Sequence, residues 1–599
     1  MSEQGSEIDP AACDVATWCG MRRGTRPGTP RGTRPGVRAI AFAVALAAAT
    51  LPSALPWAMA GAADAPARLE VPRAAAGFRL SVLATGSRIS GANGMHVGPD
   101  GLLYVASVVG SELLVLDPAD GRVVRRLAHA DGVEGPDDIA FGPDGGFYWT
   151  SILSGEVAGM RPDGTRIVAA QIGPGVNPIT FSPTGRLFVA QCFFGTGLFE
   201  VDPAGVKPPR SIRDDLGPEC GLNGMDWGPD GRLYGPRWFR GEVVSLDVDS
   251  GEMRTELTGV EVPAAVKFDS KGRLHVLDTL AGKVLRVHRA ADGTATTEVI
   301  ARLPPGLDNF AFDAADTLYV SSFVDGFVVR VNADGSQTML SPAGMSSPGG
   351  VAVRITADGV EAVVADLQAL RGFGAGDGVV RFTEPNVLGV SPMGTALNVS
   401  IDGEHLVLAS WVDNDVRVWN QREHRVVERH EGLQEPVAAV RFGAGLAIAE
   451  HKAGRVILMQ ADGGSRVLAT GFAAPTGLVV RGDDLFMTER STGTLLRLVA
   501  DGEPLTAPEV VLEGLASPEG VALYRDGFAI VEAGAGTVTV IDREGRRSTA
   551  AHLPIGLPAG SAAQPPSFVF NGIASTGDGA LIVTDERSRT LLRIERVVP

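Results

Sequence analysis

A short motif, an apolar stretch followed by Gly-Pro-Asp-Gly, recurs along this chain and limits the folds open to it. The clearest copies span Asn93–Gly101, Asp137–Gly145 and Asn223–Gly231. Aligning the chain on the motif gives twelve registers, spaced 38 to 52 residues apart. They begin at Asn93, Asp137, Asn177, Asn223, Ala264, Asp308, Gly349, Thr395, Ala438, Thr476, Glu519 and Asn571. A period of this length is typical of repeat architectures, in which each repeat is one supersecondary unit.

The internal order of each repeat predicts four short strands. An apolar strand leads through a Gly or Asp turn to a second strand, and a polar loop follows. The third and fourth strands are joined by tight turns such as 162–164, where Gly or Asp supplies the positive φ of a hairpin. Four strands make a propeller blade, and propellers close with about four to eight blades. A parallel β-helix is the alternative, but its coils are shorter and lack paired hairpins. The sequence therefore predicts an all-β fold of two tandem six-bladed β-propellers, residues 61–342 and 343–599.

The two ends of the repeat array predict how a ring closes. The twelfth repeat ends at 590–594 and lacks a fourth strand, whereas 78–84 reads as a fourth strand with no blade before it. Since an unpaired strand edge promotes aggregation, we expect the strand around Leu80 to complete the twelfth blade.

The N-terminal 60 residues have the layout of a signal peptide. Six Arg residues precede an apolar run, 39–51, and a small-residue site, Ala58-Met59-Ala60, follows. We expect cleavage near Gly61 and a periplasmic or secreted protein without a stable membrane span, an uncleaved anchor being the alternative. Met21 is a second candidate start. The signal region is thus residues 1–60.

The net charge limits the kinds of partner that the protein can bind, and the cysteines bear on its cellular compartment. The net charge of −17 disfavours nucleic acid and anionic membranes as partners. Cys192 and Cys220 lie in the predicted exported part, where a disulfide is permitted. Repeat geometry places them on the same face of adjacent blades, so we expect a bond between them, the alternative being two buried thiols.

Polar residues begin five of the six repeats of the first half. They are Asn93, Asp137, Asn177, Asn223 and Asp308, and Asp138 and Asn309 stand behind them. Carboxylate and amide oxygens converging on a propeller axis would suit Ca²⁺, or Mg²⁺. The alternative is that these side chains only cap turn amides. Arg237 and Trp238, with Asn309 and Asp138, are candidates for holding a substrate. No phosphate loop or haem motif is present, so neither nucleotide nor haem is expected.

The segment 222–234 resembles the gluconolactonase and regucalcin superfamily, which includes the NHL-type propellers. The resemblance covers residues 78–342 well and the remainder more loosely. It implies a divalent metal at the channel mouth, with Asn177 and Asn223 matching paired Asn ligands. Asn93 stands where the family has Glu, and Ala264 where it has Asp. Asp308-Asn309 resembles the Asp-Asn pair of paraoxonase-type lactonases. The resemblance thus implies a calcium-dependent lactone or ester hydrolase, with Asp308 and Asp137 as catalytic carboxylates.

Two other functions remain open from the sequence. The segments 449–456, 488–493 and 584–586 resemble streptogramin lyase-like propellers. That resemblance implies a C–O lyase with His451 as base and with Glu450 and Glu489 near a Mg²⁺. The third interpretation is a non-enzymatic propeller that presents loops to a protein or glycan partner, because fold alone does not decide function.

Overall fold

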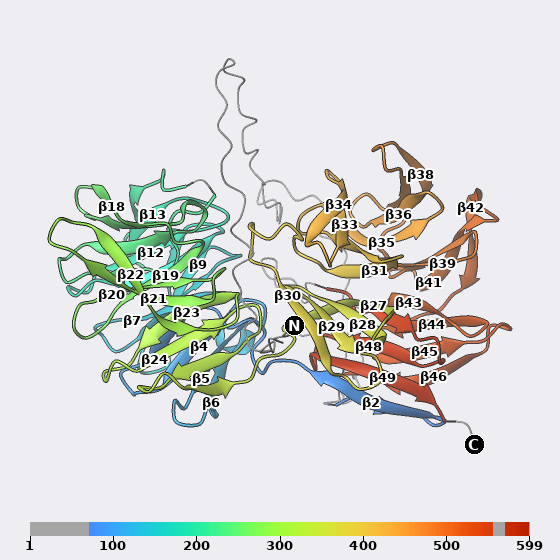
Figure 1. Ribbon diagram of the computed structural model, residues 1–599, viewed down its shortest axis with the longest axis horizontal. Helices are drawn as coiled ribbons and strands as arrows, with labels where there is room; N and C mark the ends of the chain where they lie inside the picture. The colour runs from blue at the N-terminus through green and yellow to red at the C-terminus, as the bar shows by residue number, and fades with distance from the viewer. Residues whose placement is uncertain (1–70, 218, 555–568, 598–599) are drawn as a thin grey trace, which may run out of the picture. The chain divides into compact units, whose positions relative to one another are not determined.

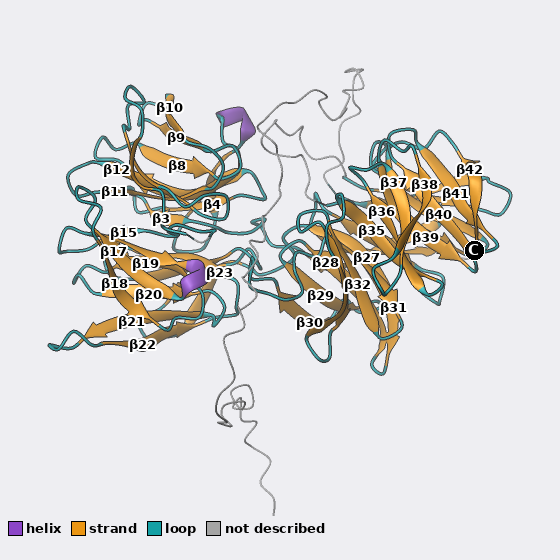
Figure 2. Cartoon of the chain, turned by 90° about the horizontal axis from the view of Figure 1, so that it is seen from above, coloured by secondary structure: helices purple, strands orange, loops and turns teal. Residues whose placement is uncertain are grey.

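The computed structural model describes residues 71–217, 219–554 and 569–597, and these form twelve antiparallel sheets. Eleven of the sheets have four strands, and the sheet that contains β43 to β46 has five because β1 (Arg73–Ala74) adds to its edge. In the described residues the helical elements are two single turns, η1 (His129–Asp131) and η2 (Trp238–Arg240) (Figure 2). The predicted all-β class is confirmed. The predicted signal region, 1–60, lies outside the described residues.

The innermost strands contact one another in two closed cycles of six, as two tandem six-bladed propellers require. The domain boundary at 342/343 stays a prediction.

The strands of the first cycle follow in chain order, blade by blade. Blade one contains β3 (Met95–Val97), β4 (Leu103–Ser107), β5 (Glu112–Leu116) and β6 (Val123–Leu127). Blade two contains β7 (Pro136–Phe141), β8 (Phe147–Ser151), β9 (Glu156–Met160) and β10 (Arg166–Gln171). Blade three contains β11 (Val176–Phe181), β12 (Leu187–Gln191), β13 (Leu198–Val201) and β14 (Arg210–Arg213). Blade four contains β15 (Asp226–Trp227), β16 (Leu233–Arg237), β17 (Glu242–Leu246) and β18 (Met253–Thr258). Blade five contains β19 (Pro263–Phe268), β20 (Leu274–Asp278), β21 (Lys283–Arg289) and β22 (Ala295–Arg302). Blade six contains β23 (Leu307–Phe312), β24 (Leu318–Ser322), β25 (Val328–Val331) and β26 (Gln337–Ser341).

The second cycle repeats this order. Blade seven contains β27 (Pro348–Thr356), β28 (Gly359–Asp366), β29 (Ala369–Gly374) and β30 (Val380–Pro385). Blade eight contains β31 (Asn398–Asp402), β32 (His405–Ser410), β33 (Asp415–Asn420) and β34 (Arg425–His430). Blade nine contains β35 (Pro436–Phe442), β36 (Gly445–Glu450), β37 (Arg455–Met459) and β38 (Ser465–Thr470). Blade ten contains β39 (Pro475–Arg481), β40 (Asp484–Glu489), β41 (Thr494–Ala500) and β42 (Glu503–Leu512). Blade eleven contains β43 (Pro518–Tyr524), β44 (Gly527–Glu532), β45 (Thr537–Ile541) and β46 (Arg547–His552). Blade twelve contains β47 (Ile573–Ser575), β48 (Leu581–Asp585), β49 (Thr590–Arg596) and β2 (Phe78–Thr85).

The twelfth blade is completed by the N-terminal strand, as predicted. Strand β2 pairs antiparallel with β49, with Leu80 opposite Ile594. Figure 1 shows the blue β2 beside the red β49. Phe78 and Leu80 also pack against the apolar cluster of blades eleven and twelve. The second ring is therefore closed by residues from opposite ends of the described chain.

The Gly-Pro-Asp-Gly motif forms the turn between the first two strands of a blade. In blade one, Asp100 accepts hydrogen bonds from the Leu102 amide (3.1 Å) and from the Tyr104 hydroxyl (3.0 Å). Gly101 adopts a φ of +76°, a conformation that favours glycine. A Cβ at Gly98 would lie 2.5 Å from the Asp100 carboxylate. Gly98, Asp100 and Gly101 thus shape the hairpin between the first two strands.

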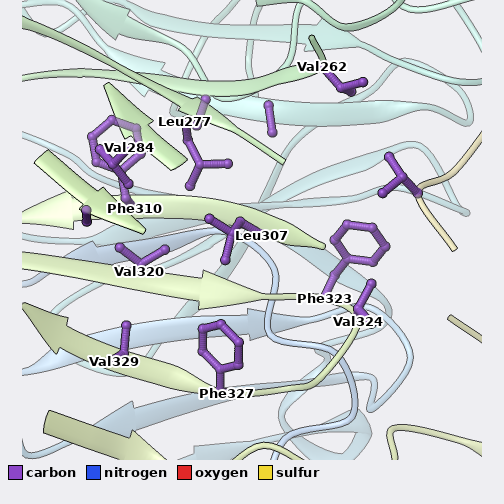
Figure 3. Packing of buried hydrophobic residues seen from close by; sticks show 14 of the residues in the cluster. Val262, Leu277, Val284, Leu307, Phe310, Val320, Phe323, Val324, Phe327 and Val329 are labelled. Carbon is purple, nitrogen blue, oxygen red and sulfur yellow. The ribbon is translucent and has the colours of Figure 1, made fainter. Parts of the chain in front are cut away.

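Apolar side chains fill the space between neighbouring blades and hold the channel walls in place. Between blades five and six, Leu277 and Val284 face Phe310, Val320 and Val329 (Figure 3). Each is buried, and full burial of such a side chain contributes about 1.5–3 kcal/mol. This packing consequently holds the starts of the innermost strands, and the side chains there, in fixed positions.

Candidate functional site

Three of the polar residues that begin the innermost strands of the first ring act on one another. Asn93 Nδ2 donates a hydrogen bond to Asp308 Oδ1 at 3.4 Å, and Asp308 and Asp137 interact electrostatically. These side chains come from blades one, six and two, which are neighbours around the ring. Asn177 and Asn223 occupy the corresponding buried positions of blades three and four. We call these five residues the mouth cluster.

The two carboxyl groups of the mouth cluster disfavour each other's ionisation. Burial, and then the charges of Asp308 and Asp138, raise the pKa of Asp137 well above its ordinary value. Burial and the charge of Asp138 raise the pKa of Asp308 to about 8, against the lowering effect of the Asn93 hydrogen bond. Neither carboxyl forms an ion pair with any residue in the described ranges. At neutral pH the pair therefore carries fewer than two negative charges.

Asp138 and Asn309 form a second layer directly behind the mouth. Asn309 Nδ2 donates to Asp138 Oδ1 at 3.4 Å. Asp138 also accepts bonds from the amides of Ile139 (2.9 Å) and Ile179 (3.3 Å). These contacts join blades six, two and three across the wall, and they fix the Asp138 carboxylate in place.

A third polar layer escaped the sequence analysis. His96, Asp226 and Lys267 lie three residues after the start of their repeats and remain half-buried. Burial raises the pKa of Asp226, and the charge of Lys267 is the largest effect that lowers it. Burial and the charge of Lys267 lower the pKa of His96 to about 4. An i, i+3 comparison across the six repeats would have found this layer, but Ala140 and Ala311 interrupt the pattern.

The donor set of the mouth cluster suits a hard cation only if amides take part. No three His, Cys, Asp or Glu side chains in the described part of the chain are grouped to hold a metal. Asp137 and Asp308 supply carboxylates, and Asn93, Asn177 and Asn223 supply amide oxygens. Turn capping accounts for part of this, since Asn93 Oδ1 accepts from Val108 N (3.1 Å) and Asn223 Oδ1 from Gly224 N (2.9 Å). Ca²⁺ accepts such mixed oxygen ligands, so the residues present fit it.

The raised pKa values give the metal-free protein a pH-dependent stability. The unfolded chain loses these protons near pH 4, whereas the folded chain keeps one until about pH 8. Between these values the unfolded state binds fewer protons, so the free energy of unfolding falls as pH rises. Asp308→Asn is expected to remove most of this dependence of the unfolding free energy on pH. Each unit by which the pKa of the folded state exceeds that of the unfolded state corresponds to about 1.4 kcal/mol. Thermal unfolding at pH 5, 6.5 and 8 with a chelator measures it.

The exposed Asp120 provides the matched control. Asp120→Asn is expected to leave the slope unchanged. An equal slope in Asp308→Asn and in the unsubstituted protein would contradict the electrostatic coupling of Asp137 and Asp308.

Arg237 and Trp238 are held by structural contacts. The Arg237 guanidinium donates to Leu216 O (2.7 and 3.0 Å) and pairs with Glu242 (2.8 Å). Trp238 Nε1 donates to Leu388 O at 3.2 Å. Both side chains are buried. Their predicted role in holding a substrate stays untested, and their contacts favour a role in packing.

The two cysteines form the expected disulfide. Cys192 and Cys220 are bonded, with their Cα atoms 3.8 Å apart. The Gly221 amide donates to Gln191 O at 2.9 Å, and the Cys192 amide donates to Gly175 O at 2.8 Å. The bond therefore ties together the two segments that enter the strands of Asn177 and Asn223.

The candidate lyase residues of the second ring cap backbone amides. Glu450 accepts a hydrogen bond from Gln434 N at 2.7 Å and pairs with Arg455. Glu489 accepts bonds from the amides of Ala474 and Thr492. Each carboxylate thus binds backbone amides of the segments that enter or leave its own blade.

His451 lies beside the start of the next blade. Its Nδ1 is 3.2 Å from Pro475 O, and its ring lies 6.2 Å from that of Phe570. These contacts occupy one face and one nitrogen of the imidazole, and they join blade nine to blades ten and twelve.

Comparison with known proteins identifies neighbours by fold. No family model and no curated relative matches the chain. Solved structures that match include a streptogramin B lyase, 14% identical, covering 48% of this chain and 94% of that one, with a TM-score of 0.35. A gluconolactonase from Xanthomonas campestris is 16% identical, covering 43% of this chain and 93% of that one (TM-score 0.33). An extracellular domain from B. thetaiotaomicron is 9% identical, covering 86% and 83% (TM-score 0.30).

These neighbours include the two kinds of enzyme that the sequence motifs resemble. At these identities and TM-scores the likeness concerns the fold and supports no statement about activity. Among the described residues no helix has the length and apolar character of a membrane span.

Proposed function

We propose that the protein is an exported hydrolase that opens a lactone or ester at the mouth of the first ring with the help of Ca²⁺ or Mg²⁺. The observation that carries this proposal is the pair of carboxyl groups of Asp137, which is buried, and Asp308, which is half-buried, set among amide side chains. Two acids that repel each other in such a place are costly without a compensating cation. Perturbed carboxyl groups of this kind are also typical of functional sites.

The residues of the mouth divide the chemistry between them. A bound divalent cation would polarise the ester carbonyl and lower the pKa of water. Asp308 or Asp137, once ionised, would accept a proton from the attacking water. Asn177 and Asn223 would contribute neutral oxygen ligands, and Asp138 with Asn309 would hold the wall behind the substrate. Small organic esters or lactones would be the partners of this site.

Export is supported by features independent of the mouth. The signal-like layout of residues 1–60 precedes the propellers, and Cys192 and Cys220 form a disulfide, which persists in oxidising compartments. A structural neighbour is described as an extracellular domain. A periplasmic or secreted location follows from this proposal.

The lyase alternative has weaker support. Glu450 and Glu489 already accept backbone amide hydrogen bonds, so using them for Mg²⁺ would leave those amides unpaired. A propeller that only binds a protein or glycan partner requires neither metal nor hydrolysis, and it is the function to expect if both are absent.

Metal content and hydrolysis together test the proposal. The purified full chain, dialysed against Ca²⁺ and desalted, is expected to retain about one equivalent of metal by mass spectrometry. A panel of lactones and aryl esters is expected to be hydrolysed, with activity lost in chelator and restored by Ca²⁺. Protein that retains no metal and hydrolyses nothing in the panel with added Ca²⁺ or Mg²⁺ would overturn the hydrolase in favour of the binding propeller.

A further inference from the structure

Arg371, on β29 of blade seven, forms ion pairs with acids of both rings, which belong to one compact unit of the chain. Its Nη1 lies 2.8 Å from Asp325 Oδ1 of blade six, and its Nε lies 2.6 Å from Asp366 Oδ2 of its own blade. Its Nη2 also donates a hydrogen bond to Val324 O at 3.0 Å. The three charged side chains are at most 10% exposed. Because a buried charge is costly without its partners, the guanidinium holds the two rings in contact at this point.

The segment that joins the rings, residues 342–347, is bonded to the same residues. The amides of Ser346 and Ser347 donate to Asp366 Oδ1 at 2.9 and 2.7 Å. Ser346 Oγ donates to Val324 O at 2.9 Å. Both serines are buried. The contact that Arg371 makes between the rings is therefore reinforced by the chain that connects them.

Two other contacts place the second ring against loops beside the first mouth. Trp238 Nε1 of blade four donates to Leu388 O at 3.2 Å. Val109 of blade one packs against an apolar cluster of the second ring, and the neighbouring Val108 amide donates to Asn93 of the mouth cluster at 3.1 Å. That apolar cluster contains Leu367, Leu397, Val412 and Val569. The second ring thus contacts loops of blades one, four and six that follow the second strand of each blade.

The blade-six loop, residues 323–327, touches the segment that enters the strand of Asp308. Val324 N donates to Gly306 O at 3.4 Å, and Ser322 Oγ donates to the same oxygen at 2.9 Å. A Cβ at Gly306 would lie 2.2 Å from Val324 Cγ2, so the two segments are in close contact. Gly306 precedes Asp308 by two residues. A shift of the blade-six loop would therefore move the start of β23 and the carboxyl group that it carries.

We propose that Arg371 of the second ring is a positioning residue for the first mouth, and that it fixes the Asp308 carboxyl group through the blade-six loop. The inference rests on the proposed function where it concerns hydrolysis. Its own content is that the second ring supports the start of β23, so that the first mouth depends on both rings. Arg371 acts through Val324 and Asp325 and takes no part in the chemical step.

Asp325→Ala tests this role with little risk to the fold, because Arg371 stays paired with Asp366 inside blade seven. Arg371→Met would instead leave two buried carboxylates without a cation. In Asp325→Ala we expect the amides of 303–312 to exchange with solvent about tenfold faster, measured by hydrogen–deuterium exchange and mass spectrometry. The exchange of β7 in blade two is expected to stay unchanged.

The same variant is expected to lower the kcat of lactone or ester hydrolysis about tenfold, because a displaced base is poorly aligned with the attacking water. KM is expected to stay nearly unchanged. Combined with Asp308→Asn, Asp325→Ala is expected to cause no further loss of kcat, since its effect passes through the Asp308 carboxyl group.

Asp377→Ala is the matched control. Asp377 also pairs with an arginine of blade seven, Arg381, at 3.1 Å, but its side chain is 52% exposed and the pair lies within one blade. This variant is expected to keep both the exchange rate of 303–312 and kcat.

The outcomes separate this inference from the proposed function. Unchanged exchange of 303–312 in Asp325→Ala would overturn the support of β23 by the second ring, and so would an equal acceleration in β7, which would indicate general loosening. A further tenfold loss of kcat in the double variant would overturn the positioning of Asp308. If the unsubstituted chain hydrolyses nothing, the proposed function fails, while faster exchange confined to 303–312 and the blade-six loop would still support the structural role of Arg371.

Discussion

Replacing Asp308 by asparagine is expected to lower the kcat of lactone or ester hydrolysis by roughly 10²–10⁴-fold, the range for loss of a general base. The amide has nearly the shape of the carboxyl group and can still accept the bond from Asn93 Nδ2, now 3.4 Å away. It cannot take a proton from water at neutral pH. The loss should therefore appear in kcat at saturating Ca²⁺, with the melting temperature in chelator unchanged or raised.

Asn223→Ala is the matched comparison because it removes a neutral ligand and leaves the carboxyl groups in place. It is expected to raise the Ca²⁺ concentration needed for half-maximal activity and to recover most of kcat when Ca²⁺ is saturating. Retention of full kcat by Asp308→Asn would refute its role as base and would direct the same test to Asp137.

Substituting Arg237 by methionine is expected to lower the free energy of unfolding by about 3–5 kcal/mol, the usual cost of removing one partner of a buried ion pair. The guanidinium side chain is 8% exposed and that of Glu242 is 17% exposed. Methionine fills similar space but leaves the carboxylate uncompensated and Leu216 O without its donor. Urea unfolding followed by tryptophan fluorescence measures the change.

Arg240 supplies the control, since its side chain is exposed and donates a long hydrogen bond, 3.5 Å, to the Gly217 carbonyl. Arg240→Met is expected to change stability by less than about 0.5 kcal/mol. If Arg237→Met keeps its stability but raises KM tenfold or more, the substrate-binding role predicted from the sequence would replace the structural one.

The fold could be predicted well from the sequence because each copy of the motif marks where the first two strands of a blade lie. The Asp and Gly of each turn have local roles, so a motif such as 98–101 defines a hairpin without tertiary information. The pairing of the strand around Leu80 with the twelfth blade also followed from the sequence, because that repeat has three strands and one strand precedes the first repeat. Side-chain direction could not be read in this way. Arg237 ends a strand near the predicted mouth, yet it turns toward the Leu216 carbonyl.

Recurrence gives the carboxylates of the candidate lyase site in the second ring a structural explanation as well. A carboxylate at the end of the second strand resembled a lyase motif at Glu450 and Glu489. The same position in blade eleven, Glu532, accepts the Ala516 amide at 2.7 Å. A residue that repeats in blade after blade is more simply explained by the architecture. In the first ring, in contrast, Lys267 is the one Lys or Arg on the innermost strands, so it is not part of a repeated pattern there.

The pairing of β2 with β49 has a consequence for biosynthesis. Arg79 and its partner Glu595 are 516 residues apart in the chain. At about 5–20 residues per second of translation, β2 would wait roughly 25 to 100 s before its partner strand is made. During that interval its edge is open to other strands, a situation that promotes misassociation. The second ring consequently cannot close until β49 has been made, so termination before that strand would leave β2 without its partner.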